Sequence, residues 1–390
     1  MIPYGKHNTN WADAFKVFWQ VRFGTLTQGK RILEFEEEVA KYVGAKFAVA
    51  VSSATAGLHI ALLAADLKPQ SNVVTSPLSF VASSNSILYS SCVPIFVDID
   101  SSTLNLDVLK TIEMANQDSS IKAIIPVHFA GEPVDMRELK NGLNRSMVII
   151  EDAAHALGST YKTGEKVGSC KYSDMTVFSL HPVKSITTGE GGIITTNSYD
   201  LYLQLLRLRS HGITKLNDQF RNPILSQTKN NINPWYYEMI QLGFNYRMTD
   251  FQAVLGKSQL ARLNRFITQR RKIVEIYSKL LEDNTQIKSA QEFSISLSAH
   301  HIFPIRINFA STSLNRQELV EKLKISGIAT QVHYIPIPLH PYYANMGYTT
   351  DEIPNAMNYY QECLTIPLYP GLKKSQQKWI IKNLLSSIHA

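Results

Sequence analysis

Cysteine is scarce in this chain of 390 residues, and its placement argues against two common kinds of site. The three cysteines, Cys92, Cys170 and Cys363, are odd in number and far apart, and none belongs to a CxxC or Cys/His spacing. A disulfide framework needs paired cysteines, and a structural zinc site needs clustered ligands. The sequence therefore predicts reduced cysteines that pack in the interior and no metal site.

Long hydrophobic runs are also missing. The first ten residues lack the apolar core of a secretory signal, and no later stretch stays uncharged over the length of a membrane span. We therefore expect a cytoplasmic protein without a membrane partner.

A concentrated basic surface is missing as well, although the formal net charge is +7. The lysines and arginines are spread along the chain, and the cluster at 269–272 lies in a helical pattern whose charges a solvated face explains. No recognition helix, zinc knuckle or aromatic RNP-like strand accompanies the charge. We therefore expect no nucleic-acid partner, because an anionic small substrate would account for the basic balance equally well.

Short β-rich runs recur between helical segments in the first two-thirds of the chain. Several are nearly continuous apolar stretches, which is typical of strands covered by helices on both faces. This pattern predicts an α/β domain with a mostly parallel sheet. The expected strands are 46–51, 72–75, 93–97, 123–127, 147–150, 175–179 and 193–196.

The remaining third predicts a smaller α+β domain, because 390 residues exceed what one hydrophobic core usually supports. A helical pattern over 251–281 could link the two domains, which we place at 1–255 and 256–390. Residues 302–307, 316–326 and 327–334 supply the expected strands and helix of the smaller domain. The segment Gln219–Tyr237, with two prolines and little periodicity, is expected to form a long functional or mobile loop.

Two side chains indicate the chemistry. Amino-group transfer through an aldehyde cofactor requires a reactive lysine and a carboxylate that keeps a pyridine nitrogen protonated. Asp152 follows the apolar strand that ends at Ile150, and Lys184 lies in a loop rich in threonine and glycine. Taken singly, such an aspartate more often caps a helix and a lysine is usually solvated. The combination of the two favours the functional interpretation.

A phosphate cradle is the third requirement. Ser53, Ala54 and Thr55 lie between a strand and a helical pattern, where free backbone N–H groups and the helix dipole attract an anion. Serine or threonine at this position is also an ordinary N-cap. Ser179, five residues before Lys184, could reach the same phosphate.

Many ordered blocks of the chain resemble the DegT/StrS class of sugar-nucleotide aminotransferases. The blocks are 26–29, 53–55, 79–82, 151–155, the segment around Lys184, 209–212, 245–250 and 331–334. The resemblance implies the fold-type-I architecture of aspartate aminotransferase, with a large, mostly parallel sheet domain and a smaller C-terminal α+β domain. It also implies pyridoxal 5'-phosphate as the cofactor.

The same resemblance implies roles for individual residues. Lys184 would bind the cofactor covalently and act as general acid and base, and Asp152 would pair with the pyridinium nitrogen. His155 would lie close to the cofactor and is the third expected catalytic residue. The other expected cofactor contacts are Phe80, which would stack on the ring, Ser53, Ala54, Thr55 and Ser179 at the phosphate, and Asn245, which would reach the phosphate of a neighbouring subunit. A homodimer with shared active sites follows.

Within the class, the chain resembles the transaminases of pseudaminic acid biosynthesis. This branch implies a UDP-linked 4-keto-6-deoxy sugar as acceptor and L-glutamate as donor, with 2-oxoglutarate as the second product. The expected substrate residues are Tyr4, Thr25, Leu26, Thr27, Gln28, Ser53, Arg247, Gln331, Val332, His333 and Tyr334. From the residues alone, Tyr4 could equally anchor a terminal segment, and His333 with Tyr334 could end a strand. Arg207, Arg209 and Arg247 are alternatives for the donor carboxylate or the pyrophosphate, and the sequence does not choose among them.

Three other functions were weighed. A transaminase for a different nucleotide-linked keto sugar is the nearest alternative. A deoxysugar dehydratase of the same class would carry histidine in place of Lys184, so the lysine argues against it. A cofactor-binding regulator or scaffold would usually carry a DNA-binding module, and the family pattern, which runs from Tyr4 to near Pro370, leads us to expect none.

Overall fold

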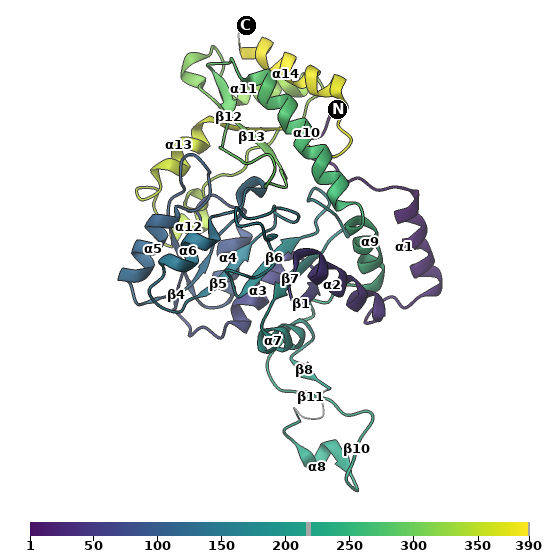
Figure 1. Ribbon diagram of the computed structural model, residues 1–390. Coiled ribbons are helices and arrows are strands. Elements are labelled where there is room, and N and C mark those ends of the chain that lie inside the picture. The colour runs from purple at the N-terminus through teal and green to yellow at the C-terminus, as the bar shows by residue number, and fades with distance from the viewer. Residues whose placement is uncertain (216–219, 389–390) are drawn as a thin grey trace.

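The computed structural model describes residues 1–215 and 220–388. Its centre is a seven-stranded sheet in the order β1-β7-β6-β5-β4-β2-β3 (Figure 1). The strands are β1 (Phe47–Val51), β2 (Asn72–Thr75), β3 (Val93–Phe96), β4 (Ile121–Ile125), β5 (Val148–Asp152), β6 (Met175–Ser179) and β7 (Gly192–Thr196). Only β7 runs against its neighbours in this sheet, pairing antiparallel with β1 and β6. The predicted α/β class with a mostly parallel sheet is confirmed.

Helices cover both faces of the sheet. Alternate residues of the strands belong to two separate hydrophobic cores: in β1, Ala48 and Ala50 face one core, and Val49 and Val51 face the other. The first core includes α2 (Lys30–Val43), α5 (Val108–Gln117) and α6 (Met136–Gly142); the second includes α3 (Ala54–Ala64), α4 (Ala82–Tyr89) and α7 (Tyr199–Arg209). Because helices cover both faces of the sheet, the strands are continuous apolar runs in the sequence.

A second domain follows, built on a three-stranded antiparallel sheet. It contains β12 (Ile287–Ser289), β13 (Phe303–Ile307), β14 (Cys363–Ile366), α11 (Arg316–Ile325), α12 (Pro341–Asn345), α13 (Pro354–Glu362) and α14 (Lys374–Ile388). The stretch 327–334, expected as a regular element, forms only isolated bridges, from Ile328 to Ile2 and from Gln331 to Thr365.

The predicted helix 251–281 is two helices, α9 (Asp250–Leu260) and α10 (Leu263–Leu281). Leu263, Phe266 and Ile267 of α10 pack in the core of the large domain, whereas Ile273 and Tyr277 pack in the core of the small one. Helix α10 therefore joins the two cores, and the boundary at residue 255 stays a prediction.

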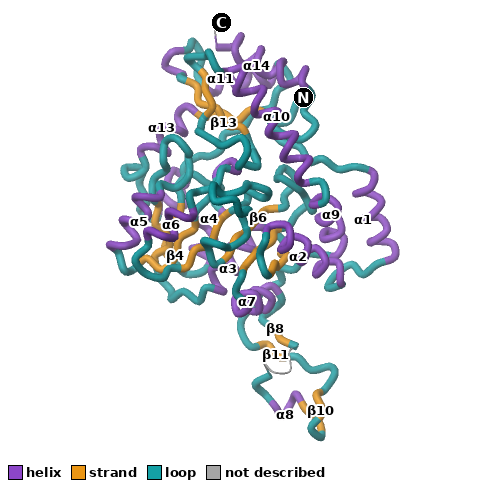
Figure 2. Tube along the Cα trace, viewed as in Figure 1, coloured by secondary structure: helices purple, strands orange, loops and turns teal. Residues whose placement is uncertain are grey.

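Two parts of the chain stand away from the sheet domain (Figures 1 and 2). One is α1 (Trp11–Phe23), beside α9. The other, which we call the arm, comprises residues 220–242 and holds only short elements: α8 (Pro223–Ser226), β9 (Gln227–Thr228), β10 (Asn231–Ile232) and β11 (Glu238–Met239), which pairs with β8 (Ile213–Thr214). The predicted loop 219–237 matches this segment from residue 220 onward, and Gln219 lies outside the described residues.

Cys92, Cys170 and Cys363 are buried and free, as predicted. None of the helices in residues 1–215 and 220–388 is long and apolar enough to cross a membrane.

Candidate active site

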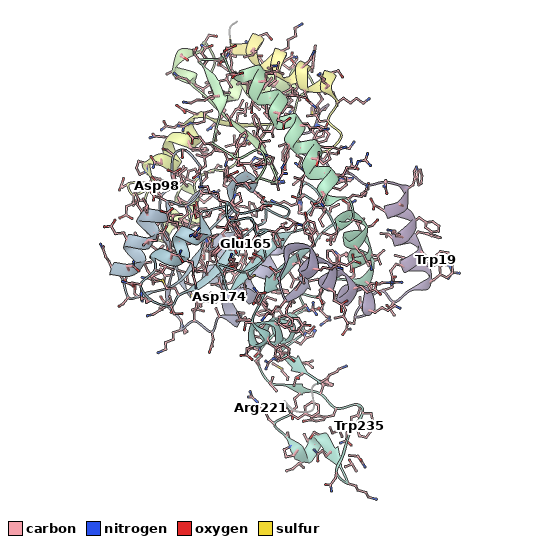
Figure 3. All side chains as sticks on the ribbon, in the orientation of Figure 1. Trp19, Asp98, Glu165, Asp174, Arg221 and Trp235 are labelled. Atoms are coloured by element: carbon pink, nitrogen blue, oxygen red, sulfur yellow. The ribbon has the colours of Figure 1, made fainter. Side chains whose placement is uncertain are left out.

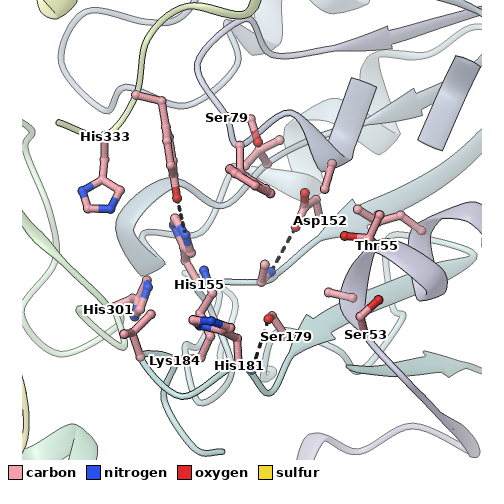
Figure 4. A pocket seen from close by; sticks show the side chains of 18 of the residues that line it. Ser53, Thr55, Ser79, Asp152, His155, Ser179, His181, Lys184, His301 and His333 are labelled. Atoms are coloured by element: carbon pink, nitrogen blue, oxygen red, sulfur yellow. Dashed lines mark hydrogen bonds between the residues drawn. The ribbon is translucent and has the colours of Figure 1, made fainter. Parts of the chain in front are cut away.

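A cavity of about 510 Å³ lies at the edge of the sheet where β1, β5 and β6 end. The carboxyl ends of neighbouring parallel strands meet at one edge, which is where α/β proteins bind ligands. Residues of the second domain complete the wall (Figure 4). Predicted site residues in the lining are Tyr4, Ser53, Ala54, Thr55, Phe80, Asp152, His155, Ser179, Lys184, Gln331, Val332, His333 and Tyr334.

Lys184 lies on the connection between β6 and β7 and lines the cavity, where it is half-buried. Its backbone N–H donates to the carbonyl of His181, while Leu180 is bonded to both Gly191 and Thr188, so the loop is closed upon itself. Burial lowers the pKa of Lys184 from 10.5 to about 8, and the charge of Asp152 limits the shift. A lysine whose pKa lies this close to neutral pH is partly deprotonated there, so its amine can act as a nucleophile and as a base.

Covalent capture of pyridoxal phosphate by the apo-protein is expected to accelerate with pH and to level off above about pH 8. The capture rate should rise with pH because only the neutral amine attacks a carbonyl, and the neutral fraction of the lysine rises about tenfold per pH unit below its pKa. Stopped-flow absorbance of the cofactor across pH 6–10 measures the rate. A rate that keeps climbing to a midpoint near 10.5 would show an ordinary, solvated lysine.

Asp152 is the last residue of β5, and its carboxylate is fixed from two sides. One oxygen accepts from the backbone N–H of Ala154 at 3.1 Å, and the other accepts from Ser83 Oγ at 2.6 Å. Ser83 Oγ in turn lies 2.7 Å from Ser79 Oγ. Residues 154–158 form turns rather than an α-helix, so Asp152 is not a helix cap. The carboxylate is thus preorganised at the cavity wall.

His155 is held as a neutral ring. Its Nδ1 accepts the N–H of Ala130 at 3.2 Å, and its Nε2 lies 3.1 Å from the Tyr334 hydroxyl. Burial and the nearby charge of Lys184 keep the pKa of His155 well below its usual value. In the neutral ring Nδ1 is the acceptor, so we assign the proton to Nε2, which donates to Tyr334. The ring of His301 packs against it with centroids 4.5 Å apart.

The start of α3 forms the expected cradle for an anion. Ser53 is the N-cap, and its Oγ accepts the N–H of Ala56 at 3.1 Å. The N–H groups of Ala54 and Thr55, in the first helical turn, have no intrahelical acceptor. Gly192 lets β7 approach this turn, because a Cβ there would lie 2.6 Å from the Ala54 nitrogen. The interpretation of Ser53 as an N-cap and the interpretation as part of an anion site are therefore compatible.

These observations show that the residues fit pyridoxal phosphate. A half-buried lysine of lowered pKa, a fixed strand-end carboxylate and a helix N-terminus line one cavity, together with the exposed ring of Phe80. The sequence did not single out Ser83 or His301. Neither has a local signal, since Ser83 lies on a short helix and His301 comes from the second domain.

Other predicted site residues lie elsewhere in the part of the chain that the structure describes. Thr25–Gln28 form an exposed connection between α1 and α2, where Thr27 pairs with Thr249. Asn245 is exposed and pairs with Ser210, and Arg247 pairs with Val51. Thr25–Gln28, Asn245 and Arg247 are all absent from the cavity lining that residues 1–215 and 220–388 form.

The arginines differ in their surroundings. Arg209 forms an ion pair with the buried Glu36 and donates to the Ala50 carbonyl at 2.8 Å, so its charge is used inside the fold. Arg207 donates to the carbonyl of Leu203. Of the three candidates, Arg209 is therefore unsuited to bind a substrate anion.

Comparisons with known proteins agree with this geometry. The model of the DegT/DnrJ/EryC1/StrS aminotransferase family matches residues 12–385. The spore coat polysaccharide biosynthesis protein SpsC of Bacillus subtilis is 37% identical over 95% of this chain and 93% of its own. The UDP-4-amino-4,6-dideoxy-N-acetyl-beta-L-altrosamine transaminase of Campylobacter jejuni is 34% identical over 99% of this chain and 97% of its own. The putative sugar aminotransferase Spr1654 of Streptococcus pneumoniae has a similar structure, which was solved in a PMP form and in a PLP form. The PMP form matches with a TM-score of 0.88 and is 28% identical; the match covers 100% of this chain and 99% of that chain.

Proposed function

Because the chain belongs to the DegT/DnrJ/EryC1/StrS aminotransferase family, we propose that it transfers the amino group of L-glutamate to a UDP-linked 4-keto-6-deoxy sugar. The acceptor we propose is UDP-2-acetamido-2,6-dideoxy-β-L-arabino-hex-4-ulose, aminated at C4 on the route to pseudaminic acid. The observation that carries the proposal is the joint placement of Lys184 and Asp152 in one cavity, in a chain that aligns over 99% of its length with a transaminase of this specificity.

The cofactor is pyridoxal phosphate, which supplies an aldehyde that carries the amino group and a ring that withdraws electrons. As a neutral amine, Lys184 would take the Cα proton of the donor and deliver it to the carbon that carried the cofactor's aldehyde. In the second half of the cycle it would move a proton in the opposite sense, from that carbon to the keto carbon of the acceptor. Asp152 presents its fixed charge to the cofactor ring. His155 and Tyr334 hold their hydrogen bond beside Lys184.

The proposal includes a homodimer. Asn245 and Thr25–Gln28 lie outside the cavity of their own chain, so they can serve a site only in another copy or after a rearrangement. The family resemblance supports the first choice, with Asn245 at the partner's cofactor phosphate. Arg247, two residues further on, is then our candidate for an anionic group of the substrate.

The alternative with a specific observation in its favour is a transaminase for another keto sugar. The relative with 37% identity belongs to spore coat polysaccharide biosynthesis, and its alignment also spans most of this chain. The lining of the cavity is compatible with either acceptor, because pockets of this size hold many small ligands. If the protein were a regulator that performs no reaction, the lowered pKa of Lys184 would have no catalytic role.

An acceptor panel tests the substrate. Protein converted to its amino form with L-glutamate is expected to regain the starting absorbance of the cofactor on addition of the proposed UDP-linked 4-keto sugar, because the amino group leaves for the ketone. A dTDP-linked 4-keto-6-deoxyglucose is the matched comparison. A response to the dTDP sugar alone would remove the proposed acceptor and keep the family activity. No conversion by glutamate would contradict the donor.

A further inference from the structure

Helix α10 carries a buried arginine, Arg270. Figure 3 shows α10 running between the sheet domain and the second domain, with side chains on all sides of the helix. Arg270 is 1% exposed, and burial lowers its pKa from 12.5 to about 10, so the guanidinium stays charged at neutral pH. None of the ion pairs within residues 1–215 and 220–388 involves Arg270. Buried charges are normally paired, because an isolated charge is costly to remove from water.

The protein satisfies only part of this guanidinium. Its Nη1 donates to the carbonyls of His301, Leu368 and His300 at 2.8, 3.1 and 3.3 Å. Its Nε is fully buried and has no hydrogen-bond partner among the described residues. An orphaned donor in the interior of a folded protein indicates a bound water or ion that completes the site.

A small cavity adjoins Arg270 and is distinct from the large one. The centre of a bound particle has about 10 Å³ in which to move, which is room for one particle of the size of water. Ser185 lines the same cavity, and its buried Oγ also lacks a partner within residues 1–215 and 220–388. Of the described residues, only Lys184 lines both cavities. Two residues with unpartnered buried donors therefore border one single-particle space behind the loop of Lys184.

The lining of this small cavity is basic. It contains four basic residues, namely Lys6, His7, Lys184 and Arg270. Among the described residues, no aspartate or glutamate lines it. Gln259, which does line it, contacts the carboxylate of Asp13 at 2.8 Å, but that carboxylate is paired with Arg262. The cavity therefore holds positive charge that no carboxylate of its lining balances.

This balance of charge favours an anion over a water. A water could accept from both orphaned donors, but it would leave the charge of Arg270 unbalanced. A phosphate, a sulfate or a carboxylate consists of several heavy atoms and exceeds the space. A halide ion is close to water in size, carries a full negative charge and accepts several hydrogen bonds at once.

We propose that Arg270 and Ser185 hold one halide ion, which is chloride in ordinary buffers. The ion joins three segments that line the cavity: α10, the loop that carries Lys184, and residues 6–8. It thereby fixes the loop of Lys184 against the second domain, whose carbonyls at His301 and Leu368 hold the same guanidinium. The inference depends neither on the sugar that is aminated nor on the dimer.

Crystals of the holoenzyme, grown in sodium gluconate and soaked in sodium bromide, test the site directly. Bromide replaces chloride and scatters anomalously, so we expect an anomalous peak within hydrogen-bond distance of Arg270 Nε and Ser185 Oγ. Density at this point without an anomalous signal would identify a water and overturn the proposal. No density there would overturn it as well.

Thermal unfolding of the holoenzyme tests the site in solution. The melting temperature in sodium chloride is compared with that in sodium gluconate at equal ionic strength, for the wild type and for Arg270→Met, which fills much of the space without a charge. We expect chloride to stabilise the wild type by at least about 2 °C more than the variant, because a bound ion stabilises the folded state. Lys272→Met, which removes an exposed charge from the same helix, is the matched control and should respond like the wild type.

Ser185→Ala covers the case in which Arg270→Met does not fold. It keeps the guanidinium and removes one donor, so the chloride concentration at half-maximal stabilisation should rise a few-fold. An unchanged midpoint in Ser185→Ala would overturn the site. An anomalous peak accompanied by equal chloride responses in the wild type and Arg270→Met would mean an adventitious ion only, bound at the concentration of the soak, and would also overturn it.

Discussion

We expect Lys184→Ala to abolish amino transfer and the visible absorbance of the protein-bound cofactor. We expect a fall of at least about 10⁴-fold in turnover, since one side chain supplies both the covalent attachment and the proton transfer. Lys184→Arg should be equally inactive, because a guanidinium stays protonated and cannot take a proton near neutral pH. Single-turnover conversion of the cofactor by L-glutamate measures the effect.

The matched control for this prediction is Lys162→Ala, which removes a lysine whose side chain is 77% exposed on the same domain. It should retain wild-type turnover. A small primary amine added to Lys184→Ala should restore part of the rate, as expected if the missing function is a base. Turnover within tenfold of the wild type in Lys184→Ala would assign the proton transfer to another group.

The strands of the large domain could be predicted because each is a buried apolar run. β2 and β6 have the predicted bounds, and β5 extends two residues further, so that Asp152 ends the strand itself. The reversed direction of β7 was not predicted. Twelve residues separate β6 from β7, and they contain no helix, which is the usual crossover of a parallel pair. The loop that carries Lys184 is therefore the turn of an antiparallel pair.

Other features depend on contacts that local patterns do not encode. The helical periodicity of 251–281 continues through Arg262, yet the helix breaks there, where the Arg262 side chain pairs with Asp13 of α1. In the site, Lys184 and Asp152 were recognisable from their combination and from the family-like segments around them, since neither residue taken singly is a specific signal. Ser83 and His301 were not, since only the folded chain brings them to Asp152 and His155. The same holds for the ion pair that removes Arg209 from the candidates.

Asp152→Asn is expected to lower turnover by at least about a hundredfold while the protein still folds and binds cofactor. Asparagine keeps the shape and can still accept from Ala154, but it lacks the negative charge that keeps a pyridine nitrogen protonated. Because the charge of Asp152 raises the pKa of Lys184, its loss should also move the rise in covalent capture to lower pH. Steady-state turnover and the pH series of capture measure the two effects.

Ser83→Ala tests the orientation of the Asp152 carboxylate separately from its charge. This variant leaves the carboxylate in place and removes only the 2.6 Å hydrogen bond to it, so a loss of a few-fold is expected, with the pH series unchanged. If both variants lost activity equally, the position of the carboxylate rather than its charge would limit the reaction. If Asp152→Asn kept full turnover, the ring nitrogen would have to be protonated by another group, and Asp152 would be a structural residue at the end of β5.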